Sequence, residues 1–168
     1  IVHRLVGSEM CIRDRPHLYD HINDCVKKEV YDADILIKYS KEEIEILNDI
    51  IDHDRDFIFT YAGLRQVADK YLVQDRSSGQ VYETPQFMYL LIAMTIFADY
   101  PKETRINYVT RYYNAISKHK INIPTPIMGG VRTPLRQFAS CVLVDADDTL
   151  DSIFSCLLYT SPSPRDGV

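Results

Sequence analysis

The stretch "TPQFMYLLIAMTIF" at residues 84–97 decides the fold of this chain. Thr84 has the hydroxyl side chain of a helix N-cap, and Pro85 suits the first helical position, where no N–H is needed. The apolar run that follows, "FMYLLIAMTIF", has 11 residues, which is fewer than the roughly 18–20 that a membrane-spanning helix needs. We therefore expect a core helix here, and we expect it to be the most buried helix of the chain.

Apolar residues at helical spacing predict four further helices on either side of this core helix. Ser40 and Glu43 have the spacing of a capping box, in which each side chain bonds the backbone N–H of the other residue. The chain contains 12 tyrosines and no tryptophan, and the tyrosines fall mainly at core spacing, so we interpret them as packing residues. The four helices are expected within residues 17–30, 39–52, 57–72 and 101–120.

The remaining segments have other patterns. Two short β-prone runs around a polar turn in "YLVQDRSSGQVYET", residues 71–84, predict a β-hairpin. Three prolines and a Gly-Gly pair in "INIPTPIMGGVRTPLRQ", residues 121–137, predict an irregular loop. The apolar, β-branched run "FASCVLVD", residues 138–145, predicts a buried strand. The fold class is therefore mainly α, with a small β-hairpin and one strand whose partner is not visible.

The two ends of the chain are related through the DNA that can encode them. "RLVGSEMCIRDR" at residues 4–15 and "CLLYTSPSPRD" at residues 156–166 can be encoded by opposite strands of one DNA segment. The segment resembles a transposase-based sequencing adapter. We interpret residues 1–15 and 156–168 as non-native, adapter-like tails and exclude them from the reasoning about the fold. The alternative is an ordinary disordered tail at each end.

Charge and cysteine usage limit the classes of function. Of 19 basic and 24 acidic residues, the tails hold four and three, which leaves 15 and 21 and a net charge of −6. This balance gives no electrostatic basis for binding nucleic acid, and no apolar run is long enough for a membrane. Only Cys25 and Cys141 lie outside the tails, and two cysteines fit a reducing, cytoplasmic location.

Four groups of side chains are candidates for a site. His17 and His21 have a spacing that can hold a metal, but no further ligand follows, so we expect a solvated helix face and no metal site. The "DHDRD" run at residues 52–56 lies at a helix junction, where capping and solvation are the usual roles. Arg132, with nearby amides and hydroxyls, could cradle a phosphate, or the segment could be a structural connector. Cys141 could be a buried core residue or a working thiol, and periodicity does not separate the two.

A resemblance separates them. "INIPTPIMGGVRTPLRQFASCVLVDADDTLDSI" and "IDHDRDFIFTYAGLRQVADKYLVQDRSSGQVYETPQFMYLLIA" closely resemble the large, catalytic subunit of class I ribonucleotide reductase. The likeness runs from about His17 to Ser155. It implies a helical N-terminal domain at residues 16–120, then a substrate loop and the first strand of a ten-stranded α/β barrel at residues 121–155. The barrel is expected to be incomplete in this chain.

The same resemblance implies the site residues. Cys141 matches one of two thiols that reduce the 2′ carbon of the substrate and become a disulfide. Thr125 and Ser140 match residues that contact the nucleotide substrate. Asp148, Thr149 and Leu150 match the edge of the specificity site, where ATP or a deoxynucleotide effector binds. No metal ligand and no directly bound cofactor are implied in this segment.

The implied function is reduction of ribonucleoside diphosphates to 2′-deoxyribonucleoside diphosphates for DNA synthesis. The implied partners are a small radical-generating subunit, thioredoxin or glutaredoxin, an ATP or deoxynucleotide effector and a second copy of the parent subunit. No nucleic acid or membrane partner is expected. The thiyl-radical cysteine and the second redox cysteine lie downstream in this family, so we expect a fragment that is inactive by itself. The alternative is a stand-alone helical nucleotide-binding or scaffold module without catalysis.

Overall fold

The structure is a computed structural model that describes residues 16–75, 77–135, 138 and 145–160. The chain divides into two compact units, one up to Phe138 and one from Ala139 onward. Each unit is described by itself below. No helix among the described residues has the length and hydrophobicity needed to cross a membrane.

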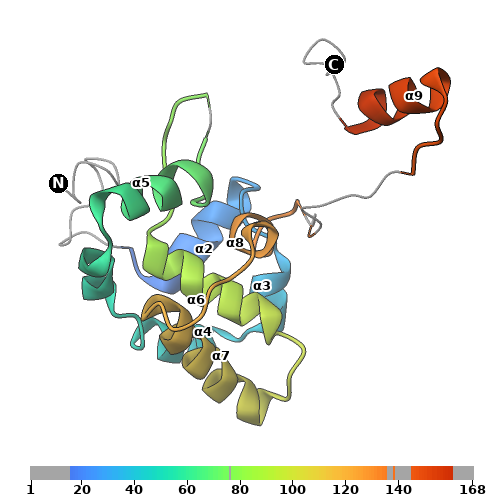
Figure 1. The fold of residues 1–168 in the computed structure, drawn as a ribbon. Helices are drawn as coiled ribbons and strands as arrows, with labels where there is room; N and C mark the ends of the chain where they lie inside the picture. Colours follow the sequence, from blue (N-terminus) through green and yellow to red (C-terminus); the bar gives the residue numbers. More distant parts are fainter. Residues whose placement is uncertain (1–15, 76, 136–137, 139–144, 161–168) are drawn as a thin grey trace. The chain divides into compact units, whose positions relative to one another are not determined.

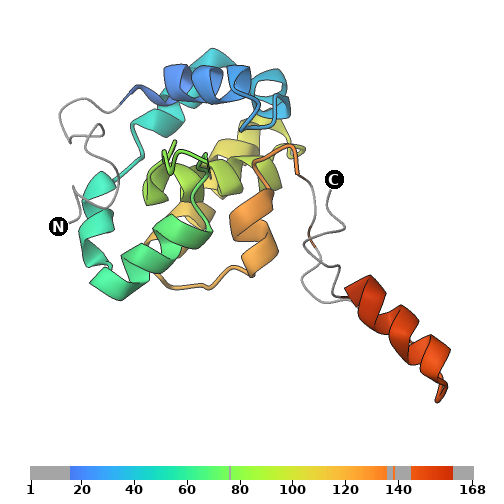
Figure 2. The same ribbon diagram turned by 90° about the horizontal axis from the view of Figure 1, so that it is seen from above.

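Helix α6, Pro85–Ile96, is the centre of the first unit. Every residue from Pro85 to Met94 is buried, and the other helices of the unit lie around α6 in both views (Figures 1 and 2). Thr84 caps the helix, because its hydroxyl accepts a hydrogen bond from the Phe87 N–H at 3.3 Å. The prediction of a buried core helix that begins after Thr84 is thus confirmed.

The surrounding helices of the first unit supply the rest of the core. Capping box residues Ser40 and Glu43 bond each other's backbone N–H groups, as predicted. Helix α7 packs along α6, and its Val109, Tyr113 and Ile116 are buried. The bounds are α2 Leu18–Lys27, α3 Asp34–Lys38, α4 Lys41–Asn48, the 3₁₀ helix η1 His53–Ile58, α5 Tyr61–Lys70, α7 Lys102–Ser117 and α8 Thr125–Gly130.

The structure differs from the sequence predictions at three places. The single helix predicted within residues 57–72 begins only at Tyr61, because the Thr60 hydroxyl caps it by accepting from the Gly63 N–H. The short helix α3, Asp34–Lys38, was not predicted. The segment predicted as an irregular loop, residues 121–137, contains helix α8, Thr125–Gly130, with Pro126 in its first turn. Proline is compatible with that turn, since the first N–H groups of a helix have no intrahelical partner.

The predicted hairpin is not shown, because its described residues contain one isolated bridge and no regular strand. Gln74 and Val81 form an isolated antiparallel bridge, and the Asp75 N–H donates to the Gln80 carbonyl at 2.8 Å. Gly79 turns the chain with a φ of 73°, a conformation that glycine adopts without strain. No named strand occurs among the described residues. The strand predicted at residues 138–145 lies almost entirely outside the described residues and stays a prediction.

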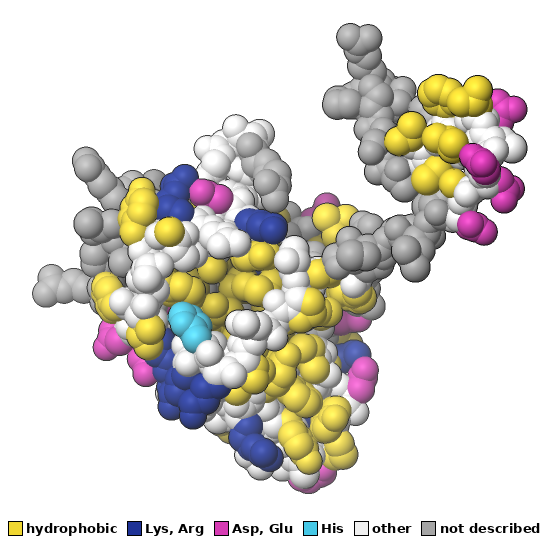
Figure 3. All heavy atoms as spheres, in the orientation of Figure 1, with side chains coloured by type: hydrophobic (Ala, Val, Ile, Leu, Met, Phe, Trp, Pro, Cys, Tyr) yellow, Lys and Arg dark blue, Asp and Glu magenta, His cyan; other side chains and the backbone are white. Residues whose placement is uncertain are grey.

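Aromatic side chains gather where α6 meets α7. Phe97 has three tyrosine rings around it, with centroid distances between 5.1 and 5.7 Å. Hydrophobic side chains cover this end of the body on the face drawn in Figure 3. The tyrosines Tyr31, Tyr39, Tyr89 and Tyr113 are buried in the core, which agrees with their interpretation as packing residues.

The second unit contains helix α9, Leu150–Thr160. Thr149 caps it, because the Ser152 N–H donates to the Thr149 hydroxyl at 3.3 Å. The large apolar side chains Leu150, Phe154 and Leu157 are exposed. The boundary predicted at residue 156 therefore falls inside a helix, while residues 1–15 and 161–168 lie outside the described residues. The assignment of both tails stays a prediction.

Candidate functional site

The residues predicted to do chemistry lie in different parts of the structure. Thr125 is exposed at the start of α8 in the first unit. Ser140 and Cys141 lie outside the described residues. Asp148 and Leu150 flank the Thr149 cap of α9 in the second unit, and all three residues are exposed. The predicted substrate contact Thr125 and the predicted effector contacts at residues 148–150 therefore belong to different units.

Helix α8 presents Thr125 next to Tyr71. The Thr125 hydroxyl oxygen lies 3.3 Å from the Tyr71 hydroxyl oxygen, and either group can be the donor. Tyr71 is the last residue of α5's C-terminal turn, where its N–H donates to the Val67 carbonyl. Two segments that are 54 residues apart in sequence therefore meet through their hydroxyl groups.

Arg132 anchors the other end of α8 and is completely buried. Its Nε donates to the two carboxylate oxygens of Glu83 at 3.1 and 2.9 Å, and its Nη2 also contacts Glu83. Its Nη2 donates to the Tyr71 carbonyl at 2.9 Å, and its Nη1 donates to the Met128 carbonyl. Of the two alternatives for Arg132, these contacts favour the structural connector, because its guanidinium donors are directed at internal partners in the core.

Glu83 is the matching buried acceptor. Its carboxylate accepts from the Val73 N–H at 2.7 Å and from the Tyr31 hydroxyl at 2.6 Å, in addition to Arg132. A buried ion pair is stable only when additional hydrogen bonds compensate the loss of water. Burial would lower the pKa of Arg132, but the attraction of Glu83 outweighs it and raises that pKa. Burial and the neighbouring Glu83 carboxylate hold the pKa of Tyr31 well above its usual range.

His21 and Cys25 extend this buried group along α2. His21 stacks on Phe87 at a centroid distance of 4.6 Å, and its Nε2 lies 3.2 Å from the Tyr31 hydroxyl. Burial lowers the pKa of His21 to about 4, and burial raises the pKa of the Cys25 thiol to about 12. The expected solvated face is wrong for His21, and Cys25 is an inert core thiol since the thiolate is the reactive form.

The "DHDRD" segment serves the helix junction. Asp52 caps η1 by accepting from the Asp54 N–H at 3.2 Å, which confirms the capping role. Asp56 is buried and accepts from the Gln86 side chain at 2.8 Å. Within the described ranges, no group of three or more His, Cys, Asp or Glu side chains is arranged to hold a metal ion.

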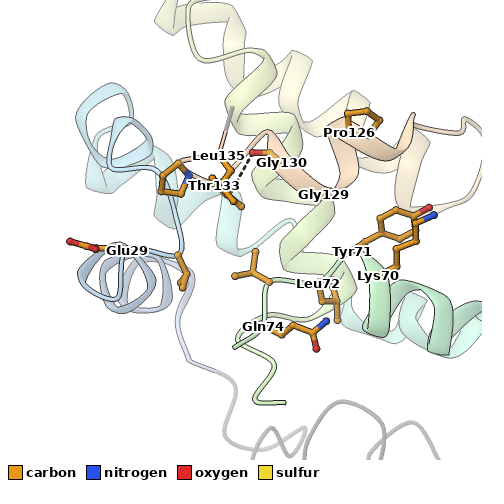
Figure 4. A pocket seen from close by; sticks show the side chains of 13 residues that line it. Glu29, Lys70, Tyr71, Leu72, Gln74, Pro126, Gly129, Gly130, Thr133 and Leu135 are labelled. Atoms are coloured by element: carbon orange, nitrogen blue, oxygen red, sulfur yellow. Dashed lines mark hydrogen bonds between the residues drawn. The ribbon is translucent and has the colours of Figure 1, made fainter. Parts of the chain in front are cut away.

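A cavity of about 580 Å³ lies between α8 and the turn that follows α5. Lys70, Tyr71 and Gln74 line one wall, and Gly130 and Thr133 line the opposite wall (Figure 4). The Thr133 hydroxyl donates to the Gly130 carbonyl at 2.9 Å and closes the end of α8. Open space therefore separates the two walls.

Sequence reasoning missed Tyr71, Glu83 and Tyr31 as partners of the predicted site. Arg132 is a candidate in the sequence, but its partners Glu83 and Tyr71 lie 49 and 61 residues away along the chain. One local signal indicates a buried ion pair: Glu83 lies directly before Thr84, which caps a core helix. A charged residue at a core position needs a partner of opposite charge. A single sequence does not say which of its basic residues supplies that charge.

The described residues of the first unit form an all-α domain around one buried helix. A short helix of this domain presents Thr125. Residues 57–136 match the family model described as the all-alpha domain of ribonucleotide reductase. The chain belongs to the ribonucleotide reductase family, as a segment of its large, alpha subunit.

Three relatives show the extent of the similarity. The ribonucleoside-diphosphate reductase subunit alpha of Haemophilus influenzae is 54% identical over 140 residues, or 83% of this chain. The reductase 1 subunit alpha of Escherichia coli is 52% identical over 138 residues, or 82% of this chain. The subunit alpha of Enterobacteria phage T4 is 51% identical over 134 residues, or 80% of this chain. The chain spans 18% of the length of each of these relatives.

Proposed function

We propose that this chain is part of an enzyme that reduces ribonucleoside diphosphates to 2′-deoxyribonucleoside diphosphates by radical and dithiol chemistry. The observation that carries the proposal is the identity of 54% over 140 residues with a ribonucleoside-diphosphate reductase subunit alpha. The aligned length equals the 140 residues between the two predicted tails. Residues 138–145 are proposed to form the first strand of the α/β barrel in the intact enzyme.

Cys141 is the proposed redox thiol of this segment. It and a second cysteine elsewhere in the subunit supply two electrons and two protons: the 2′ hydroxyl leaves as water, a hydrogen takes its place on the 2′ carbon, and the two thiols become a disulfide. Ser140 is proposed to contact the substrate next to this thiol. Thioredoxin or glutaredoxin then returns the disulfide to two thiols.

Thr125 is proposed to contact the diphosphate end of the substrate from the start of α8. The exposed position of its hydroxyl supports this role, since a substrate can reach it. A hydroxyl is both donor and acceptor, so Thr125 can donate to a phosphate oxygen while accepting from Tyr71.

The residues Asp148, Thr149 and Leu150 are proposed to contribute to the specificity site for ATP or a deoxynucleotide. Asp148 and Leu150 are exposed, which supports contact with a ligand. The Asp148 carboxylate can accept from a sugar hydroxyl, and Leu150 can pack on a base. The Thr149 hydroxyl already accepts from Ser152, so its proposed contribution is to fix the start of α9.

Further partners follow from the same proposal. A small subunit supplies the radical, and two large subunits form the dimer in which the effector binds. A cytoplasmic location fits an enzyme that depends on thioredoxin or glutaredoxin. The segment itself binds no metal or prosthetic group in this proposal.

The test is the Cys141→Ser substitution in the full-length subunit that contains this segment. Thioredoxin-supported turnover should fall to the blank level, while the thermal unfolding temperature should stay within a few degrees because serine is close to cysteine in shape. The matched control is Cys25→Ser, at the buried thiol, which should lower stability through a buried hydroxyl and retain turnover. Retained turnover in Cys141→Ser contradicts the proposal.

A further inference from the structure

The position of Thr125 depends on a helix that has little stability of its own. Helix α8 has six residues, Thr125–Gly130, and includes two glycines. Isolated helices of that length do not persist in water, so tertiary contacts must hold it. Ile127, Met128 and Val131 pack one side of α8 against the core. That packing sets the depth of the helix but does not decide which χ1 rotamer the exposed Thr125 side chain adopts.

The side of α8 that faces the turn after α5 is not closely packed. The cavity of about 580 Å³ separates α8 from that turn. Polar contacts therefore set the spacing between the two segments. At the far end of α8, Arg132 bonds both the Met128 carbonyl and the Tyr71 carbonyl. At the near end, the Tyr71 hydroxyl meets the Thr125 hydroxyl at 3.3 Å.

Tyr71 belongs to both of these contacts, and its own position is fixed from several directions. Its N–H donates to the Val67 carbonyl at 2.9 Å, and its carbonyl accepts from the buried Arg132. The Lys70 ammonium lies 5.4 Å from the centroid of the Tyr71 ring, and the two side chains lie beside each other in Figure 4. The ring is partly buried and packs against the core. The hydroxyl of Tyr71 is thus held at a defined place at the end of a rigid ring.

We infer that Tyr71 is a positioning residue for Thr125, which fixes the rotamer in which the Thr125 hydroxyl meets the substrate. The inference rests on the proposed substrate contact of Thr125. Tyr71 does not touch the reacting atoms. It acts by removing the rotational freedom of the Thr125 side chain before the substrate binds, which lowers the entropic penalty of binding.

The first experiment measures the rotamer directly in the 168-residue chain, without substrate. The probe is NMR of a sample labelled with ¹³C in its threonine methyl groups, read as the three-bond couplings of Thr125. The unsubstituted chain should show one dominant χ1 rotamer, and Tyr71→Phe should show averaged couplings. The matched control is Tyr61→Phe, at the exposed tyrosine that opens the same helix α5, and it should leave the couplings unchanged. Unchanged couplings in Tyr71→Phe overturn the inference.

The second experiment measures the consequence for binding in the full-length subunit, with its small subunit and thioredoxin. Tyr71→Phe should raise the KM for a ribonucleoside diphosphate by about threefold to tenfold with kcat nearly unchanged, since a ground-state contact is weakened. Thr125→Val should raise KM at least as much. The double variant should equal Thr125→Val alone, because both substitutions remove one coupled contact.

The outcomes separate the two proposals. An unchanged KM in Thr125→Val contradicts the proposed substrate contact, and the methyl couplings still decide the role of Tyr71. A raised KM in Thr125→Val with an unchanged KM in Tyr71→Phe overturns the positioning role and leaves the substrate contact intact. Effects that add in the double variant also overturn it, because independent residues do not share one contact.

Discussion

At the scale of single residues, the body contains titratable side chains that are stabilised by partners far away in the sequence. Arg132 and Glu83 are completely buried together, and Arg105 pairs with Glu43 from α7 to α4. His21 is different, because its ring is buried and forms no ion pair with a residue in the described part of the chain. Glu83 and Asp24 attract a proton to His21, while burial and Lys28 oppose it, and burial has the largest effect. Folding therefore favours the neutral form of this ring.

The first prediction concerns the pH dependence of stability. His21 has a pKa of about 4 in the folded chain, against 6.5 as the ordinary value. The unfolded chain binds the proton first, so stability is fully present above pH 6.5 and is lost as the pH falls toward 4. The slope in that window is about 1.4 kcal/mol per pH unit for one proton. Urea unfolding at several pH values in this range should show it.

Substitution identifies the group responsible. His21→Gln should reduce the slope of the unfolding free energy against pH by about 1.4 kcal/mol per pH unit between pH 4 and 6.5. This holds whatever the effect of the substitution on stability at pH 7. His17→Gln is the matched control, since His17 lies four residues away on the same helix turn and is half-exposed beside Glu45. An undiminished slope in His21→Gln would show that another group controls this transition.

At the scale of elements, local signals predicted helix ends well. The caps at Ser40 and Thr84 were visible in the sequence, because a cap is formed by residues within three positions of each other. Helices α3 and α8 were missed for the opposite reason. They have five and six residues, too few for a helical period to show, and the prolines and glycines around α8 indicated a loop. Their helical form depends on packing against the core, which no local pattern contains.

The second prediction tests the cap of the core helix. Thr84→Ala should destabilise the chain by about 1–2 kcal/mol, because the Phe87 N–H then loses its acceptor in a buried setting. Thr84→Ser keeps the hydroxyl and should recover most of that loss. The free energy of unfolding from urea titration measures both variants. Equal destabilisation by alanine and serine would mean that the threonine methyl group, and not the cap, stabilises this position.

At the scale of the whole molecule, the mainly helical character and the family followed from the sequence, while the arrangement around Thr125 did not. The pattern of apolar residues predicts which faces are buried, and the resemblance supplies the proposed site residues. The contacts of Arg132 with Glu83 and Tyr71 join segments 49 and 61 residues apart. Such pairings follow from how the helices pack together, which a single sequence does not specify.

The last prediction concerns the activity of the 168-residue chain itself. Reduction of a ribonucleotide needs two thiols that become a disulfide, and one of them is proposed to be Cys141. Cys25 cannot be the other, because it is buried in the core with a pKa of about 12 and forms almost no thiolate at neutral pH. Cys11 and Cys156 belong to the predicted non-native tails. The chain should therefore give no deoxynucleotide above the blank.

The assay contains the small radical-generating subunit, thioredoxin, a ribonucleoside diphosphate and an effector, and it measures deoxynucleotide product. A full-length alpha subunit in the same mixture is the positive control. The expected loss is complete, because removing one member of a catalytic unit removes nearly all of its rate. Product that disappears in Cys141→Ser would mean that the chain holds a complete dithiol site, with a partner for Cys141 among its own cysteines.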